Sequence, residues 1–104
     1  MGEWYEAAGY VVLDRNWRVR DGEIDVIVRR ASTIVFCEVK TRRSDAFGTP
    51  AEAVTPRKQA RLRKLAVQWL AANGARADTL RFDVASVRPD GRGAWLVDVL
   101  AAAF

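Results

Sequence analysis

The chain has 104 residues, of which 50% are hydrophobic and 29% charged, and its net charge is +4. These proportions predict one globular domain spanning residues 1–104 and exclude an intrinsically disordered chain. Histidine is absent and the lone cysteine has no internal partner, which excludes Cys/His zinc sites, histidine-based triads and disulfide-stabilised folds.

The first half of the chain predicts a short helix followed by strands. Residues 2–8 are typical of a helix that ends at Gly9, a residue suited to the C-cap. Strands are expected where β-branched and aromatic residues gather between turn signals, at residues 10–13 with a continuation at 16–20, then at 24–28 and 34–39. The turn signals are Asp21-Gly22 and Ala31-Ser32.

The second half predicts a loop at residues 44–55, a long helix and two more strands. Thr55 is suited to the N-cap and Pro56 to the first helical position, while Asn73-Gly74 ends the helix. The core-facing stripe of this helix is expected to be Leu62, Leu65, Ala66, Trp69 and Leu70. The last two strands are expected at residues 80–87 and 94–100.

This order of elements predicts an α/β fold in three layers, with a central mixed five-stranded sheet flanked by helices. Trp4, Trp17, Trp69 and Trp95 are expected in the core, with nucleic-acid contact as the alternative for Trp17, which lies between two arginines. No segment approaches the ~18 apolar residues of a membrane span, and the Met1-Gly2-Glu3-Trp4 start lacks signal-peptide features. A cytoplasmic protein is therefore expected.

Charged residues interrupt the third predicted strand at Glu38 and Lys40, directly after an apolar run. An ionised carboxylate in such a strand is costly unless it is paired or bound to a metal. Residues two apart share a face of a strand, so Glu38 and Lys40 are expected side by side. A hairpin turn centred on Ala31-Ser32 places Asp25 opposite Glu38 and Glu23 opposite Lys40.

Two facing carboxylates repel each other unless a positive group lies between them. Oxygen ligands of this kind suit Mg²⁺ or Mn²⁺, and a neighbouring lysine can orient or help to deprotonate a metal-bound water. This arrangement predicts metal-assisted phosphodiester hydrolysis, with Asp25, Glu38, Lys40 and Glu23 as candidate catalytic residues. The alternative is a structural salt-bridge cluster, in which Glu23 pairs with Lys40 and Asp25 pairs with a nearby arginine such as Arg42.

These motifs resemble the YraN family of bacterial proteins and, more broadly, the PD-(D/E)xK or restriction-endonuclease-like nuclease superfamily. The resemblance covers about residues 9–70, with a weaker echo at Arg81-Phe82-Asp83-Val84. The matching segments are Arg15-Asn16-Trp17-Arg18, Gly22-Glu23-Ile24-Asp25, Glu38-Val39-Lys40-Thr41-Arg42, Phe47-Gly48 and Ala51-Glu52-Ala53-Val54-Thr55-Pro56-Arg57-Lys58.

The resemblance implies a nuclease fold whose members resolve Holliday junctions or splice archaeal tRNA. It assigns Asp25 and Glu38 as metal ligands, with the Val39 carbonyl completing the set and Lys40 as the catalytic lysine. Two-fold assemblies are common in such nucleases, which makes a homodimer the oligomer to test. The family also carries a longer first helix with a glutamate that assists the metal, and Glu3 and Glu6 lie out of register with it.

A basic surface is the expected contact for the polyanionic partner, which is DNA with branched or single-stranded features. Seventeen Lys and Arg residues oppose 13 Asp and Glu residues, and most of these cations are arginine, although genome composition also raises arginine content. The predicted nucleic-acid contacts are Arg42, Arg43, Arg57, Lys58, Gln59, Arg61 and Lys64. A solvated helix face is the alternative for the helical members, and a degenerate nucleic-acid-binding module or a protein-interaction domain is the alternative to a nuclease.

Overall fold

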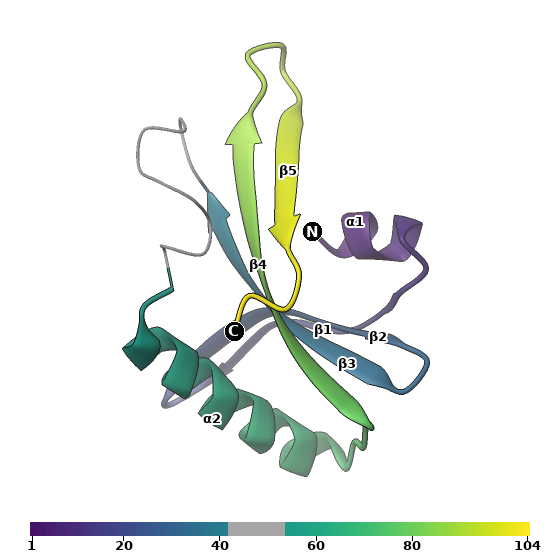
Figure 1. The fold of residues 1–104 in the computed structure, drawn as a ribbon, viewed down its shortest axis with the longest axis vertical. Helices are drawn as coiled ribbons and strands as arrows, with labels where there is room; N and C mark the ends of the chain where they lie inside the picture. Colours follow the sequence, from purple (N-terminus) through teal and green to yellow (C-terminus); the bar gives the residue numbers. More distant parts are fainter. Residues whose placement is uncertain (42–53) are drawn as a thin grey trace.

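The computed structural model describes residues 1–41 and 54–104. Within them it forms two helices and five strands (Figure 1). In chain order these are α1 (Gly2–Ala7), β1 (Val11–Val19), β2 (Gly22–Arg30), β3 (Thr33–Thr41), α2 (Pro56–Asn73), β4 (Thr79–Pro89) and β5 (Trp95–Leu100). The predicted loop at residues 44–55 lies largely outside the described residues.

The strands form one mixed sheet in the order β1-β2-β3-β4-β5. The first three pair antiparallel as successive hairpins, β3 and β4 pair parallel, and β5 returns antiparallel beside β4. A parallel pair needs a crossover connection, which α2 supplies between β3 and β4. The predicted α/β class and the mixed five-stranded sheet are therefore confirmed.

Each face of the sheet has its own apolar cluster, because successive side chains of a strand point to opposite faces. In β3, Ile34 and Phe36 belong to the cluster that contains the buried side chains of α2. Val35 and Cys37 belong to the other cluster, together with Tyr5 of α1. The two helices thus pack on opposite faces of the sheet.

Helix α2 begins and ends as its sequence predicts. The Thr55 side chain accepts a 3.3 Å hydrogen bond from the Lys58 backbone N–H, and Gly74 ends the helix in the left-handed conformation with φ of 58°. The predicted stripe is confirmed, since Leu62, Leu65, Ala66 and Trp69 are buried and Leu70 is partly buried. Neither helix is long and apolar enough to cross a membrane within the described residues.

Three expectations about local structure are wrong. Strand β1 is continuous where a break was expected, because a register shift between Val12 and Asp14 absorbs the irregularity. Strict alternation along residues 24–28 predicts Ile24 on the same face as Val26 and Val28, but Ile24 packs in the α2 cluster and the two valines pack in the other. Trp4 and Trp95 lie outside the core, with 40% and 59% of their surface exposed.

A buried carboxylate joins three separate segments of the chain. Asp83 in β4 is 1% exposed and accepts hydrogen bonds from the Tyr5 hydroxyl (2.7 Å) and the Ala102 backbone N–H (3.0 Å). Arg81 adds two guanidinium hydrogen bonds, both of 2.9 Å. Burial raises the pKa of Tyr5, and the hydrogen bond to Asp83 raises the pKa of Arg81. Asp83 therefore fixes α1 and the C-terminal segment to the sheet.

Candidate functional site

The candidate site lies where β2 and β3 stop pairing. The predicted register is confirmed from Arg30 opposite Thr33 to Val26 opposite Cys37, which is the last pair of the described ladder. The predicted pairing of Asp25 with Glu38 lies one step beyond it. There the Val39 backbone N–H donates a 2.7 Å hydrogen bond to Asp25 Oδ2, so the carboxylate takes the place of a strand partner.

Glu38 and Lys40 lie side by side, as their spacing in one strand predicts. The Lys40 Nζ is 3.1 Å from Glu38 Oε1, and both side chains are mostly shielded from solvent. Glu23 forms its ion pair with Arg18 of the neighbouring strand rather than with Lys40. The Glu23–Lys40 pair expected in the structural alternative is therefore wrong, whereas its Asp25–Arg42 pair involves a residue outside the described part of the chain.

The pKa of Asp25 is raised to about 6. Burial of the carboxylate is the largest cause, and the hydrogen bond from the Val39 N–H opposes it. The hydrogen bond with Glu23 and the negative charges of Glu38 and Glu23 raise the pKa further. The fork between the strands therefore concentrates negative charge that a cation would stabilise.

The carboxylates form one wall of a hollow of about 190 Å³ beneath the first turns of α2. Its lining residues are Gly22, Glu23, Asp25, Glu38, Lys58, Arg61, Leu62 and Leu65. Gly22 lies against α2, where an added Cβ would meet Leu65 Cδ1 at 3.2 Å. Acidic side chains of β2 and β3 thus share the hollow with cationic and apolar side chains of α2.

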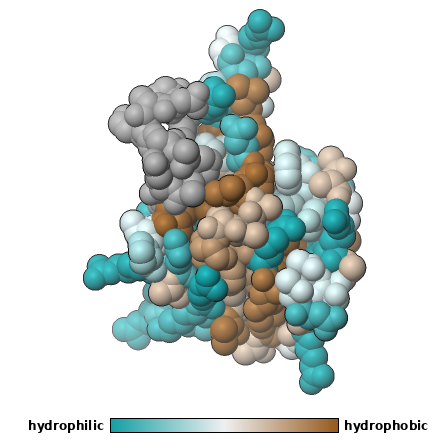
Figure 2. Space-filling view, viewed as in Figure 1, coloured by the Kyte–Doolittle hydropathy of each residue, from teal (hydrophilic) through white to brown (hydrophobic). Residues whose placement is uncertain are grey.

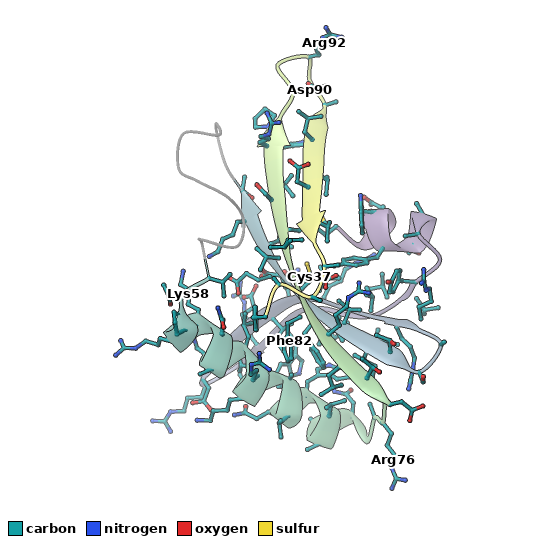
Figure 3. The ribbon with its side chains drawn as sticks, viewed as in Figure 1. Cys37, Lys58, Arg76, Phe82, Asp90 and Arg92 are labelled. Atoms are coloured by element: carbon teal, nitrogen blue, oxygen red, sulfur yellow. The ribbon has the colours of Figure 1, made fainter. Side chains whose placement is uncertain are left out.

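The predicted nucleic-acid contacts do not all converge on this hollow. Lys58, labelled at the start of α2 in Figure 3, and Arg61 line it. Arg57 is exposed to solvent. Arg42 and Arg43 lie outside the described residues. Arg42 is also the arginine that the salt-bridge alternative pairs with Asp25.

Two other members of this set make contacts within the fold. Lys64 Nζ is 3.6 Å from Asp21 Oδ2, and Gln68 donates a 2.8 Å hydrogen bond to the same oxygen, so both side chains hold the β1–β2 turn against α2. These contacts lower the pKa of Asp21, with the Gln68 hydrogen bond as the largest cause. Gln59 donates to the Val54 carbonyl at 3.1 Å, which fixes the entry to α2.

Among the described residues, the carboxylates of Glu23, Asp25 and Glu38 lie together at the fork. No group of three Asp, Glu or Cys side chains in residues 1–41 and 54–104 is arranged to hold an ion. Mg²⁺ is commonly bound through one or two carboxylates together with waters and substrate phosphates. Asp25 and Glu38 fit that donor set. Burial is the largest cause of the raised pKa of Asp25, and the negative charges of Glu38 and Glu23, which a cation would offset, raise it further.

A second hollow approaches Asp25 from beside α1, and apart from Asp25 and Val39 its lining residues were not predicted as a site. Its volume is about 360 Å³, and it is lined by Met1, Gly2, Arg15, Asn16, Asp25, Val26, Val39 and Thr41. Asn16 takes a positive φ of 49°, which marks an irregular point in β1. The Arg15-Asn16-Trp17-Arg18 segment is the sequence signal for this hollow. The sequence analysis interpreted Arg15 only as a neighbour of Trp17.

Comparison with known proteins identifies the family. The profile described as "Uncharacterised protein family UPF0102" matches residues 1–87. A UPF0102 protein of Beutenbergia cavernae is 52% identical over 95% of this chain and 84% of its own length. Relatives from Kineococcus radiotolerans and Frankia alni are 56% and 48% identical, over 83% and 94% of this chain and 71% and 82% of theirs. The chain belongs to the UPF0102 family, the YraN-like family that its motifs indicated.

Proposed function

We propose that this protein is a metal-dependent endonuclease that hydrolyses phosphodiester bonds in structured DNA, in the manner of Holliday-junction resolvases. The observation that carries the proposal is the fork of β2 and β3. There Asp25 and Glu38 approach each other, Lys40 lies 3.1 Å from Glu38, and two cations of α2 face them across one hollow. Acidic ligands, a lysine and phosphate-binding cations are the components that phosphodiester hydrolysis needs.

Asp25, Glu38 and the Val39 carbonyl are the groups that would hold the cation. When bound, Mg²⁺ or Mn²⁺ supplies Lewis-acid stabilisation of the charge that develops on the phosphate. Asp25 is held in place by the Val39 N–H, and Glu38 is held by Lys40. Both carboxylates are therefore oriented before any ligand arrives.

Lys40 and the first turns of α2 supply positive charge around the scissile phosphate. The Lys40 ammonium lies 3.1 Å from Glu38, which lines the hollow, and in the proposed reaction it would orient an attacking water. Lys58 and Arg61 line the same hollow, and in this proposal they would contact phosphate oxygens near the cleaved bond. Leu62 and Leu65 exclude water beneath them and so strengthen these electrostatic interactions.

We also propose that the fold is the restriction-endonuclease-like variant of a mixed five-stranded sheet. Three features support this proposal: the ExK segment ends a central strand, its hairpin partner carries the aspartate, and the following helix crosses over to a parallel strand. Fold alone does not establish an activity, so the chemistry is tested at the site.

The test is cleavage of labelled duplex, single-stranded and four-way-junction DNA in Mg²⁺ or Mn²⁺. We expect the wild-type chain to cut, and Lys40→Ala to cut at least about 100-fold more slowly, because a positioned proton donor or acceptor contributes that much. Asp25→Asn and Glu38→Gln should lose metal-dependent cleavage. The matched control is Asp78→Asn, because the Asp78 carboxylate is exposed and immediately precedes the first residue of β4.

Two results would contradict the nuclease. Cleavage that survived all three substitutions would arise from another site or from a contaminant. Intact DNA with retained, salt-sensitive binding would instead identify a degenerate binding module of the same fold.

A further inference from the structure

Two exposed tryptophans border a recess on the side of the sheet that carries α1. The recess has a volume of about 530 Å³ and is lined by Met1, Glu3, Trp4, Thr41, Val87, Trp95 and Val97. Trp4 comes from α1 and is 40% exposed, whereas Trp95 comes from the edge strand β5 and is 59% exposed. Figure 1 shows the N-terminus and α1 beside β5, and residues of both elements line the recess.

The recess is lined by valines of β4 and β5 as well as by the two indoles. In Figure 2 hydrophobic surface runs along the β4–β5 ribbon, below a hydrophilic hairpin tip. Exposed aromatic side chains that gather at one recess indicate an interaction site for a ligand or a partner macromolecule. Flat apolar partners gain most there, because aromatic rings stack on one another.

The recess is continuous with the candidate site. Met1 and Thr41 line both the recess and the 360 Å³ hollow beside α1. That hollow also contains Arg15 and Asn16, and Asp25 belongs both to it and to the hollow beneath α2. A chain of neighbouring cavities therefore leads from the two tryptophans past a guanidinium to the Asp25 carboxylate.

The charged residues along this path indicate where a base and where a phosphate would bind. Glu3 borders the recess and would repel a phosphate, but its carboxylate can accept a hydrogen bond from the exocyclic amine of a base. Arg15 in the connecting hollow suits the phosphate. Stacking on an aromatic side chain stabilises an unpaired base whatever its identity.

We propose that the Trp4–Trp95 recess binds an unpaired nucleobase of the nucleic acid whose backbone passes Arg15 to the Asp25 site. This inference rests on the proposed nuclease function and specifies its substrate as a duplex that carries a single-stranded segment. A base inside a duplex is stacked and paired, so only an unpaired one can enter the recess.

Binding of three DNA probes without divalent metal tests the recess: a blunt duplex, a duplex with a single-stranded tail, and the same tail made abasic. We expect the wild-type chain to bind the tailed duplex about 10-fold more tightly than the abasic one, since one stacked base contributes that much. Trp95→Ala and Trp4→Ala should each remove this difference and leave blunt-duplex affinity unchanged. Trp95→Phe should retain most of it.

Leu96→Ala is the matched control, because Leu96 follows Trp95 in β5, is 41% exposed and points to the opposite face of the strand. It should behave as the wild type does. Circular dichroism of each variant checks that the fold is retained. The two tryptophans lie on different elements, so the test does not depend on one variant folding.

Three outcomes would overturn the inference. If the preference for the tailed duplex survives both alanine substitutions, the recess does not bind the base. The nuclease proposal still stands in that case if the wild type cleaves DNA with Mg²⁺ and Glu38→Gln does not. No nucleic-acid binding by the wild type overturns both proposals. A dimer that Trp95→Ala dissociates in light scattering, without any base preference, makes the recess an interface between copies of the chain.

Discussion

The charge state of a single side chain, Asp25, links the candidate site to the stability of the fold. Its pKa is raised from 3.8 to about 6, so the folded protein holds this proton more tightly than the unfolded chain does. The stability contributed by the protonated group is complete below about pH 4 and is lost as the pH rises through about 6.

The Asp25→Asn variant tests this linkage, because the amide does not titrate and its oxygen can still accept the hydrogen bond from Val39. Urea denaturation between pH 4 and pH 7 should show wild-type stability falling relative to the variant as the pH rises. Adding Mg²⁺ at pH 7 should then stabilise the wild type and not the variant. Parallel pH profiles for the two proteins would show that Asp25 titrates normally.

At the scale of secondary-structure elements, Asp83 attaches α1 and the C-terminal segment to β4. Asp83 is the acceptor in four hydrogen bonds, from the Tyr5 hydroxyl, two guanidinium nitrogens of Arg81 and the Ala102 N–H. A carboxylate satisfies these donors, whereas an amide turns an N–H₂ group toward some of them. The same contact helps to set the position of α1, and with it that of Trp4 in the recess.

Asp83→Asn should lower the free energy of unfolding by about 2–3 kcal/mol, since buried donors then lose a charged acceptor. Urea denaturation measures the loss, and Asp98→Asn on exposed β5 serves as the control with an expected change within about 0.5 kcal/mol. Equal stabilities for the two variants would mean that the network contributes little. Tyr5→Phe removes one donor and should cost less than Asp83→Asn.

On the scale of the whole molecule, positive charge is distributed unevenly around an acidic site. The net charge is +4, yet the fork of β2 and β3 gathers Glu23, Asp25 and Glu38 beside the cations of α2. Arg76 and Arg92 point away from the body at opposite ends of the molecule (Figure 3). Cations beside the hollow should therefore contribute more to binding than those at the ends.

Salt titration of DNA binding separates these two groups of cations. Lys58→Ala and Arg61→Ala should each weaken binding and reduce the slope of log K against log salt by about one phosphate contact. Arg76→Ala, which lies at the far end of the molecule, should change neither quantity appreciably. Equal effects at all three positions would indicate a diffuse attraction with no preferred track.

Much of the fold and part of the site are predictable because short-range rules govern them. Turn residues and alternation in the strands placed the elements and fixed the hairpin register through Val26 and Cys37. Spacing alone made Glu38 and Lys40 neighbours. The capping residues and apolar spacing predicted α2 from Thr55 to Gly74.

The sequence by itself therefore determined the family, the element order and the spacing that makes Glu38 and Lys40 neighbours. Only the tertiary structure decided that α2 crosses over to place Lys58 and Arg61 above Asp25, that Asp83 is buried among donors, and that Trp4 and Trp95 remain exposed. The reason is physical: periodicity and turn preferences act over a few residues, whereas burial, pKa shifts and shared cavities depend on which distant segments pack together.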